Sequence, residues 1–308
     1  MWNNTFIIHI SNQIKEIVRV YLVLVKVMLP AVIIVKLLDL VGATDLLAYC
    51  LSPAMDIVGL PQEMGLVWAV ALLTNIYTAM VVFYSIAANN AISVADISVL
   101  GVMILIAHGL PVEGAIAKSL GIRWRVTLLV RVGGALLLGS ILNLLYSTLQ
   151  WKQEPIALSW APTTSHSFGW IQWSIEQAQL FASIFVILTA LIIMLRILRL
   201  LGIEALLHKL LSPLLRGLTL GKEAANITII GMTLGISFGA GLLIDEVKKG
   251  HISKRDTALV MGFLGLCHSI IEDTLLILLL GADVYAILWG RLVFAICIVA
   301  IWGRMYKQ

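Results

Sequence analysis

The stretch Met261-Gly-Phe-Leu-Gly-Leu-Cys-His-Ser-Ile-Ile-Glu-Asp-Thr274 is apolar as far as Cys267 and then becomes polar. After it, residues 275–280 are apolar again. Ionisable groups inside an apolar segment of membrane length are costly, so they usually face a protein interior or a water-filled cavity. The polar side chains are therefore the first candidates for a functional site: His268, Ser269, Glu272, Asp273 and Thr274.

The same arrangement occurs 160 positions earlier, where apolar residues 101–107 precede His108 and are followed by Pro111 and Glu113. Other polar residues match at this offset: Leu51-Ser-Pro53 with Leu211-Ser-Pro213, Glu63 with Glu223, Asp96 with Asp256, and Arg131 with Arg291. A general richness in leucine cannot produce matches of this kind. They predict a duplicated unit, as is common in transporters.

The composition indicates a polytopic all-α membrane protein. Of the 308 residues, 60% are hydrophobic and 12% are charged, about half the charged share of a soluble domain. Several apolar runs exceed the ~20 residues that cross a bilayer. Lys and Arg are scattered at the ends of these runs, so the net charge of +4 does not suggest nucleic-acid binding.

No cofactor and no enzymatic activity are predicted, because nucleotide-binding fingerprints and nucleophile–base motifs are missing from the sequence. The three cysteines lack a CxxC spacing and are expected to be reduced thiols. Cys267, His268 and Glu272 could act as metal ligands, but their spacing is not that of a compact multi-ligand site. We therefore predict no metal.

The predicted layout has a first repeat over 1–148, an external Trp-rich linker over 149–170 and a second repeat over 171–308. Each repeat is expected to hold about three transmembrane helices, an interfacial amphipathic helix and a re-entrant helical hairpin. In the first repeat, the spans are 14–38, 61–88 and 124–147, the interfacial helix is 43–58 and the hairpin is 94–120. In the second, 222–244 is the expected span and 254–280 the hairpin.

Charged residues predict that the repeats are inverted, because loop 39–63 is acidic whereas its partner 196–222 is basic. Inversion requires an odd number of crossings in each half, which is why 94–120 and 254–280 are assigned as hairpins. Both termini are then cytoplasmic, in a bacterial inner membrane. One loop disagrees: residues 245–256 should face outside, yet they contain Lys248, Lys249, Lys254 and Arg255.

The two histidines, at the expected hairpin tips, could carry protons, bind a metal or contact a substrate. The alternative is that each is a neutral ring that caps a broken helix. Glu113, Glu272 and Asp273 could bind solute or protons, or could only stabilise helix starts. For the intramembrane cations Arg131 and Arg291, structural pairing with carboxylates is favoured over binding an anion.

Further candidate contacts lie in the middle of the other apolar segments. Asn75 and Thr78 interrupt 61–88, and the small and polar residues of 222–244 include Asn226 and Ser237. The glycines there also suit close helix packing, which is the default explanation for such spacing.

These motifs resemble the Gate, or nucleoside-recognition, domain family of membrane proteins, which includes spore maturation A and B type proteins and the Gate regions of the ferrous iron transport B protein. The residues that carry the resemblance are Gly59-Leu-Pro-Gln-Glu-Met64, Leu220-Gly-Lys-Glu-Ala-Ala-Asn226 and the polar run 268–274. The resemblance covers nearly all of the chain except the linker. It implies inverted Gate-like repeats and a role in transport, although the polar centres of 61–88 and 222–244 carry no cysteine.

We expect a secondary transporter, with proton coupling as one option, for a small polar solute or ion bound at the membrane midplane between the hairpins. The alternative is a membrane scaffold or partner subunit of a larger complex in which the hairpins only pack. Beyond the lipid bilayer and the solute, a second copy of the chain is the remaining candidate partner.

Overall fold

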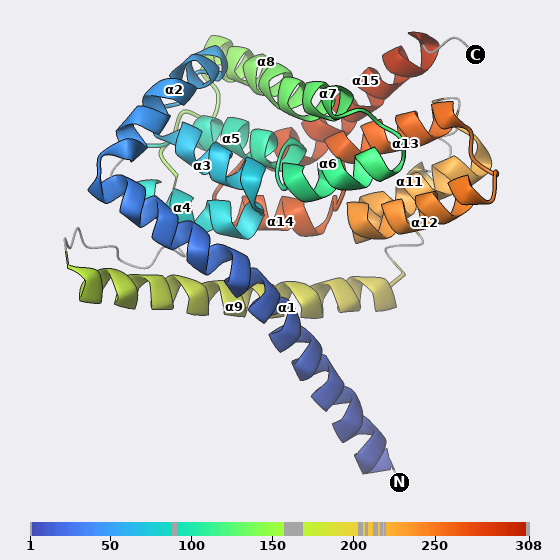
Figure 1. The fold of residues 1–308 in the computed structure, drawn as a ribbon, viewed down its shortest axis with the longest axis horizontal. Helices are drawn as coiled ribbons and strands as arrows, with labels where there is room; N and C mark the ends of the chain where they lie inside the picture. Colours follow the sequence, from blue (N-terminus) through green and yellow to red (C-terminus); the bar gives the residue numbers. More distant parts are fainter. Residues whose placement is uncertain are drawn as a thin grey trace.

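The computed structural model describes residues 2–87, 91–156, 169–202, 206, 209–211, 215, 218 and 220–305, and these are helical with no β-strand among them. Within this described part of the chain, five helical segments are long and apolar enough to cross a membrane: Gln13–Leu40, Val94–Ser119, Trp124–Leu149, Trp170–Leu200 and Tyr285–Met305. The predicted all-α class is confirmed (Figure 1).

The elements of the two halves follow one another in the same order. The first half contains α1 Trp2–Leu40, α2 Ala43–Val58, α3 Met64–Leu73, α4 Ile76–Ala87, α5 Val94–Ile106, α6 Leu110–Ser119, α7 Trp124–Leu128, the π-helical turn η1 Leu129–Gly133 and α8 Gly134–Leu149. The second contains α9 Trp170–Leu200, α11 Lys222–Leu234, α12 Ile236–Lys248, α13 Lys254–Leu266, α14 Glu272–Leu278, the π-helical turn η2 Tyr285–Gly290 and α15 Arg291–Met305. The counterpart of α2 falls mostly on residues outside the described part.

Burial separates the central from the peripheral helices. In the most apolar stretch of Val94–Ser119, 72% of the residues are buried, against 11% in that of Gln13–Leu40.

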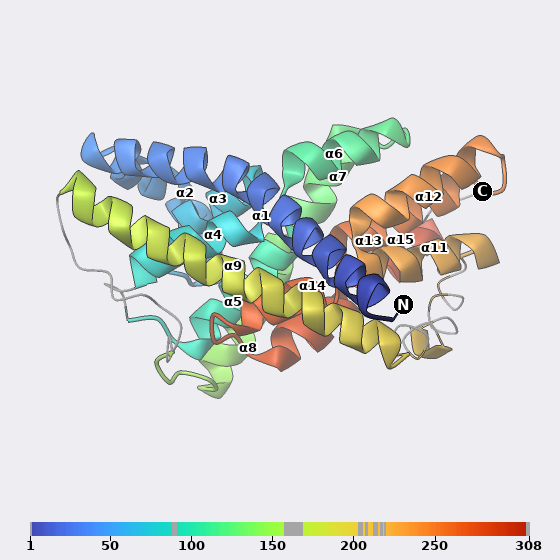
Figure 2. The same cartoon turned by 90° about the horizontal axis from the view of Figure 1, so that it is seen from below.

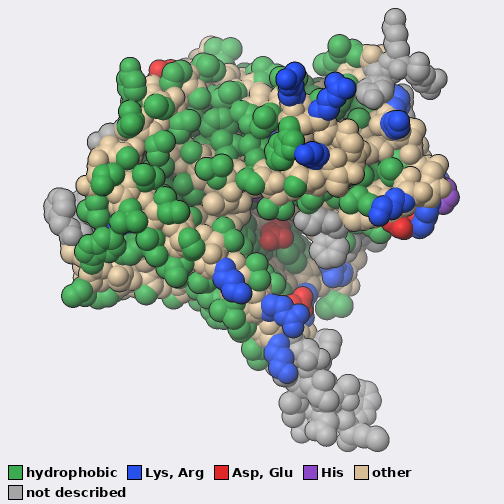
Figure 3. Space-filling view, in the orientation of Figure 1, with side chains coloured by type: hydrophobic (Ala, Val, Ile, Leu, Met, Phe, Trp, Pro, Cys, Tyr) green, Lys and Arg blue, Asp and Glu red, His purple; other side chains and the backbone are tan. Residues whose placement is uncertain are grey.

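The long helices α1 and α9 cross on one side of the molecule (Figures 1 and 2), where Tyr21 donates a hydrogen bond to the Phe181 carbonyl at 3.0 Å. Their exposed apolar side chains make an outer surface suited to lipid (Figure 3).

Helices α5 and α13 begin with the same capping signal. Ser93 Oγ accepts from the backbone N–H of Asp96 at 3.1 Å, and the Asp96 carboxylate accepts from the Ser93 N–H at 2.9 Å. At the start of α13, Ser253 Oγ accepts from the Asp256 N–H at 3.0 Å. These side chains satisfy N–H groups that a helix start leaves unpaired.

The segments that fold back on themselves are not those expected from the sequence. Helix α3 packs along α4, and α11 packs along α12 (Figure 1). A Cβ on Gly239 would lie 2.6 Å from the Gly231 Cα, although eight residues of continuous helix rise about 12 Å. The chain reverses at Gly235, whose φ of 93° favours glycine. The assignment of 61–88 and 222–244 as single spans is therefore wrong: each is a helical hairpin.

Conversely, 94–120 and 254–280 do not fold back. Helix α5 begins where Ser93 bridges Pro155 of the linker, whereas Ile122, beyond the end of α6, shares a cavity with Trp302 near the end of α15. Helix α13 begins beside that same end, where Arg255 Nη2 donates to the Gly303 carbonyl at 3.0 Å. After α14, a Cβ on Gly281 would lie 3.4 Å from the side chain of Ile156 in the linker. Each pair of helices thus runs through the molecule with a break in the middle, and the expected hairpins are corrected to broken helices.

The exchange of the hairpin and span assignments explains the basic charge of loop 245–256, which disagreed with the layout predicted from the sequence. The α12–α13 connection lies at the end of the molecule where α1 begins and α15 ends (Figures 1 and 2), not at the linker end. Lys and Arg side chains gather toward this end (Figure 3). Hydrogen bonds to Asp245 and Glu246 raise the pKa of Lys249, which keeps it cationic there.

The close contact inside the α11–α12 hairpin leads to a prediction about stability. Gly239→Ala should lower the free energy of unfolding by about 1–3 kcal/mol, because the added methyl group meets the Gly231 backbone rather than a movable side chain. Gly241→Ala is the matched control, since open space surrounds that position, and alanine there should be neutral or stabilise by up to about 1 kcal/mol. Denaturant titration in detergent measures both, and equal effects would contradict the packing.

Candidate functional site

Each histidine is held by the end of its own helix. Helix α5 ends at Ile106 and α13 at Leu266. The Nδ1 of His108 lies 2.9 Å from the Ile104 carbonyl oxygen, and the Nδ1 of His268 lies 2.7 Å from the Leu264 carbonyl oxygen. A carbonyl can only accept, so Nδ1 carries the proton in both rings and Nε2 is left with a lone pair when the ring is neutral.

The two Nε2 atoms face each other. They are 3.3 Å apart, in rings whose centroids are 5.0 Å apart, and both side chains are buried. The chain positions differ by 160, which is the offset at which the sequence predicts a duplicated unit, and the two side chains meet in the interior of the molecule.

Glu113, in the first turn of α6, joins this pair. Its Oε1 lies 3.5 Å from the Nε2 of each histidine. Its Oε2 accepts a hydrogen bond from Arg131 Nη1, and Arg131 Nε donates to the Ile106 carbonyl at 2.8 Å. Arg131 stands on the π-helical turn η1 and is buried. Arg131 and Glu113 thus form a buried ion pair.

Asp273 approaches the pair from α14. Its Oδ2 is 3.9 Å from His268 Nε2 and has no hydrogen-bond partner within the described residues. The His108, His268 and Asp273 ligand atoms all lie within 4.8 Å of one another. The second predicted cation, Arg291, is fully buried and donates from Nη2 to Thr274 Oγ1 at 3.2 Å, a hydroxyl rather than the expected carboxylate.

Two further candidates lie next to this centre. Glu272 Oε1 accepts from Tyr77 Oη of α4 at 3.3 Å, which links the two halves. Ser269 has a φ of 45° and its Oγ would lie 3.1 Å from a Cβ on Gly235, so it sits against the turn of the α11–α12 hairpin.

Asn75, Thr78 and Asn226 make no hydrogen bond to the histidine pair within the described residues. The Asn75 side chain accepts from the N–H of Thr78 at 2.9 Å and from its hydroxyl at 3.1 Å, so this pair caps the start of α4. Asn226 is six residues before Met232, whose carbonyl contacts Ile270, and therefore about 9 Å farther along α11. The Ser237 side chain lies outside the described residues.

The broken helices are supported by the hairpins. Gly109 N–H donates to the Ala71 carbonyl at 2.9 Å, and Ile270 N–H donates to the Met232 carbonyl at 2.8 Å. Backbone groups freed by the breaks are thus satisfied by the ends of α3 and α11, as a membrane interior requires.

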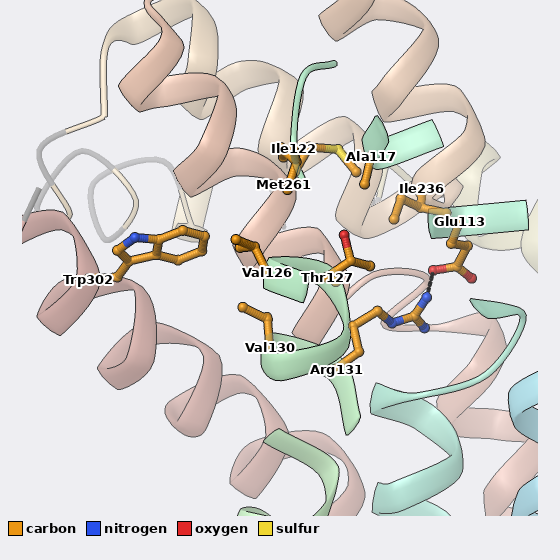
Figure 4. Close-up of a pocket in the computed structure, with 12 residues that line it drawn as sticks. Glu113, Ala117, Ile122, Val126, Thr127, Val130, Arg131, Ile236, Met261 and Trp302 are labelled. Atoms are coloured by element: carbon orange, nitrogen blue, oxygen red, sulfur yellow. Dashed lines mark hydrogen bonds and ion pairs between the residues drawn. The ribbon is translucent and has the colours of Figure 1, made fainter. Parts of the chain in front are cut away.

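A cavity lies beside the centre on the side of Arg131 (Figure 4). It offers about 20 Å³ to the centres of water molecules, enough to admit one. Its wall contains both partners of the buried ion pair together with mainly apolar groups, among them Thr127, Ile236, Met261 and Trp302.

Sequence reasoning missed a second polar cluster between the halves. Asp283 Oδ2 accepts from Tyr146 Oη at 3.0 Å, and the Asp283 N–H donates to Ser98 Oγ at 2.7 Å. The sequence shows Asp283 only as a single acidic residue in a short connection, because its partners are more than 130 positions away. Nothing in the sequence indicates that the Tyr146 and Ser98 side chains are buried and hydrogen-bonded to Asp283.

Comparison with known proteins supports the membrane class. The chain is 28% identical over 285 residues to the uncharacterized membrane protein YvoD of Bacillus subtilis (strain 168), covering 92% of this chain and 90% of that protein. No protein-family model matches the chain, and no solved structure matches it. Together with the apolar helices, this similarity identifies the chain as a membrane protein with several spanning helices.

Proposed function

We propose that this membrane protein is a secondary transporter built from two inverted repeats, with a small polar solute or ion bound between the breaks of α5–α6 and α13–α14. The observation that supports it most directly is the 3.3 Å contact of His108 with His268, equivalent residues of the two halves. Charged and polar groups buried at such a junction usually serve a solute or proton pathway.

The inverted arrangement follows if the hairpins are re-entrant. Each half then has three crossings: α1, α5–α6 and α7–α8 in the first, and α9, α13–α14 and η2–α15 in the second. The hairpins α3–α4 and α11–α12 enter and leave on one side each. An odd number of crossings places the halves in opposite orientations, with both termini on the Lys/Arg-rich side, which is cytoplasmic by the charge rule. Membership of the Gate family and location in a bacterial inner membrane are part of this proposal.

Labelling of single cysteines tests the topology. In a background with Cys50, Cys267 and Cys297 replaced by serine, Lys249→Cys should react with an impermeant maleimide only from the cytoplasmic side. Lys152→Cys, in the linker, should react only from the opposite side. Labelling of both positions from the same side would contradict the revised crossings and the inversion with them.

Uptake by proteoliposomes tests the transport function. His268→Ala and Glu272→Ala should abolish saturable uptake of the solute identified by screening organic acids, nucleosides and metal ions. His251→Ala is the matched control, because this histidine is exposed and pairs with Glu246 in the α12–α13 connection. Unchanged uptake or phenotype in folded His268→Ala and Glu272→Ala protein would favour the scaffold role instead.

A further inference from the structure

The histidine pair has an unbalanced electrostatic arrangement. Both Nδ1 protons are committed to backbone carbonyls, so two lone pairs face each other across 3.3 Å. The Glu113 carboxylate and the unpartnered Asp273 Oδ2 add negative charge around the same point. Donors of this kind, all buried, are suited to a cation placed between them.

The distances fit a tetrahedral metal ion. With metal–nitrogen bonds of about 2.0–2.1 Å and metal–oxygen bonds of about 2.0–2.2 Å, adjacent ligand atoms in a tetrahedron are separated by roughly 3.3–3.5 Å. The two Nε2 atoms are 3.3 Å apart, and Glu113 Oε1 is 3.5 Å from each of them. These three atoms form a nearly equilateral triangle, which is one face of such a tetrahedron.

Asp273 completes the donor set. Its Oδ2, which has no hydrogen-bond partner among the described residues, is 3.9 Å from His268 Nε2 and within 4.8 Å of the His108 ligand atom, so Asp273 has to move closer to occupy the fourth corner. The surrounding contacts are those that orient metal ligands: each imidazole N–H is bound to a carbonyl, and the second oxygen of Glu113 is bound to Arg131.

We propose that the site binds one divalent first-row transition-metal ion of the Zn²⁺ type, through His108, His268, Glu113 and Asp273, and that this ion is the cargo. Two imidazoles and two carboxylates suit Zn²⁺ and its neighbours better than Mg²⁺ or Ca²⁺, which take all-oxygen sites. The three carboxylates Glu113, Glu272 and Asp273 outnumber the guanidinium groups Arg131 and Arg291, so the cluster can accept positive charge. The assignment as cargo rests on the proposed function, whereas binding does not.

Titration with Co²⁺ tests the binding site directly. Purified protein, stripped with a chelator, should bind one Co²⁺ per chain with the visible absorption of a four-coordinate ion, and Zn²⁺ should displace it. His108→Ala and His268→Ala should each weaken binding by more than about 100-fold, since even loss of a second-shell partner typically costs 10–100-fold. His251→Ala should bind as the unaltered protein does. If the alanine variants do not fold, Glu113→Gln replaces them, because glutamine is similar in shape to glutamate and its uncharged side chain should also weaken Co²⁺ binding.

Uptake of radioactive zinc by proteoliposomes separates binding from transport. Uptake that is lost in Glu113→Gln would support the assignment as cargo. One bound ion without zinc uptake would overturn that assignment, while the binding site would stand. No binding of Co²⁺ or Zn²⁺ at micromolar concentration would overturn the metal site. In that case, histidine-dependent uptake of another solute would still support the transporter.

Discussion

Replacing Arg131 by methionine should lower the free energy of unfolding by about 3–5 kcal/mol, the usual loss when one member of a buried ion pair is removed. Arg131 is 2% exposed, donates to Glu113 and also satisfies the Ile106 carbonyl. Without it, the carboxylate remains buried beside two imidazoles with no guanidinium to balance it. Denaturant titration in detergent micelles is the appropriate measurement.

Two variants show whether the loss comes from the unpaired charge. The double variant Arg131→Met with Glu113→Gln should recover much of the stability, because no isolated charge is left behind. Arg196→Ala removes the arginine from a surface pair with Glu16 and should cost at most about 1 kcal/mol. Equal losses at Arg131 and Arg196 would show that the buried pair is not a structural element.

Asp283→Ala should destabilise the protein by about 2–4 kcal/mol. The substitution leaves the buried Tyr146 hydroxyl without its acceptor, which costs about 1–3 kcal/mol. It also removes the Oδ1 contact with the Tyr285 N–H, a capping interaction worth about 1 kcal/mol. Because Tyr146 belongs to the first half and Asp283 to the second, the same change should loosen their junction, detectable as faster amide exchange in α8.

Comparison with an exposed aspartate isolates the effect of burial. Asp39→Ala, at an exposed carboxylate that pairs with Lys36, should change stability by no more than about 0.5 kcal/mol. Tyr146→Phe should reproduce part of the Asp283→Ala loss, since it leaves the carboxylate without its donor. A loss below 0.5 kcal/mol in Asp283→Ala would mean that this cluster does not join the halves.

The polar residues of the sequence were enough to locate the centre but not to determine how the chain reaches it. His108 and His268 were paired from their spacing alone, and the structure places them in contact. The sequence does not give the direction of the chain after each helix break, because an interruption such as Thr74-Asn75 or His108-Gly109 can either reverse the chain or only displace the helix axis. What distinguishes them is packing between helices, as in the Gly231–Gly239 contact, which depends on tertiary structure.

One signal in the sequence favours the proposed arrangement, namely the charge of residues 245–256. Four basic side chains in a loop assigned to the outside contradicted the charge rule, and exchanging hairpin and span removes the contradiction. Metal ligands were not predicted for a different reason. Each half supplies only one histidine and one carboxylate five positions later, His108 with Glu113 and His268 with Asp273, and two donors do not make a recognisable metal motif.

The helix ends that hold the two imidazoles also limit how the centre can change. Each ring is fixed by a bond to a carbonyl one turn back in its own helix, so rotating it would forfeit that bond. The distance between the two Nε2 atoms is therefore set by the relative positions of α5 and α13, and it reports the separation of these helices. A ligand bound by both rings would therefore respond to any relative movement of α5 and α13, so a spectroscopic probe of these rings would report that movement.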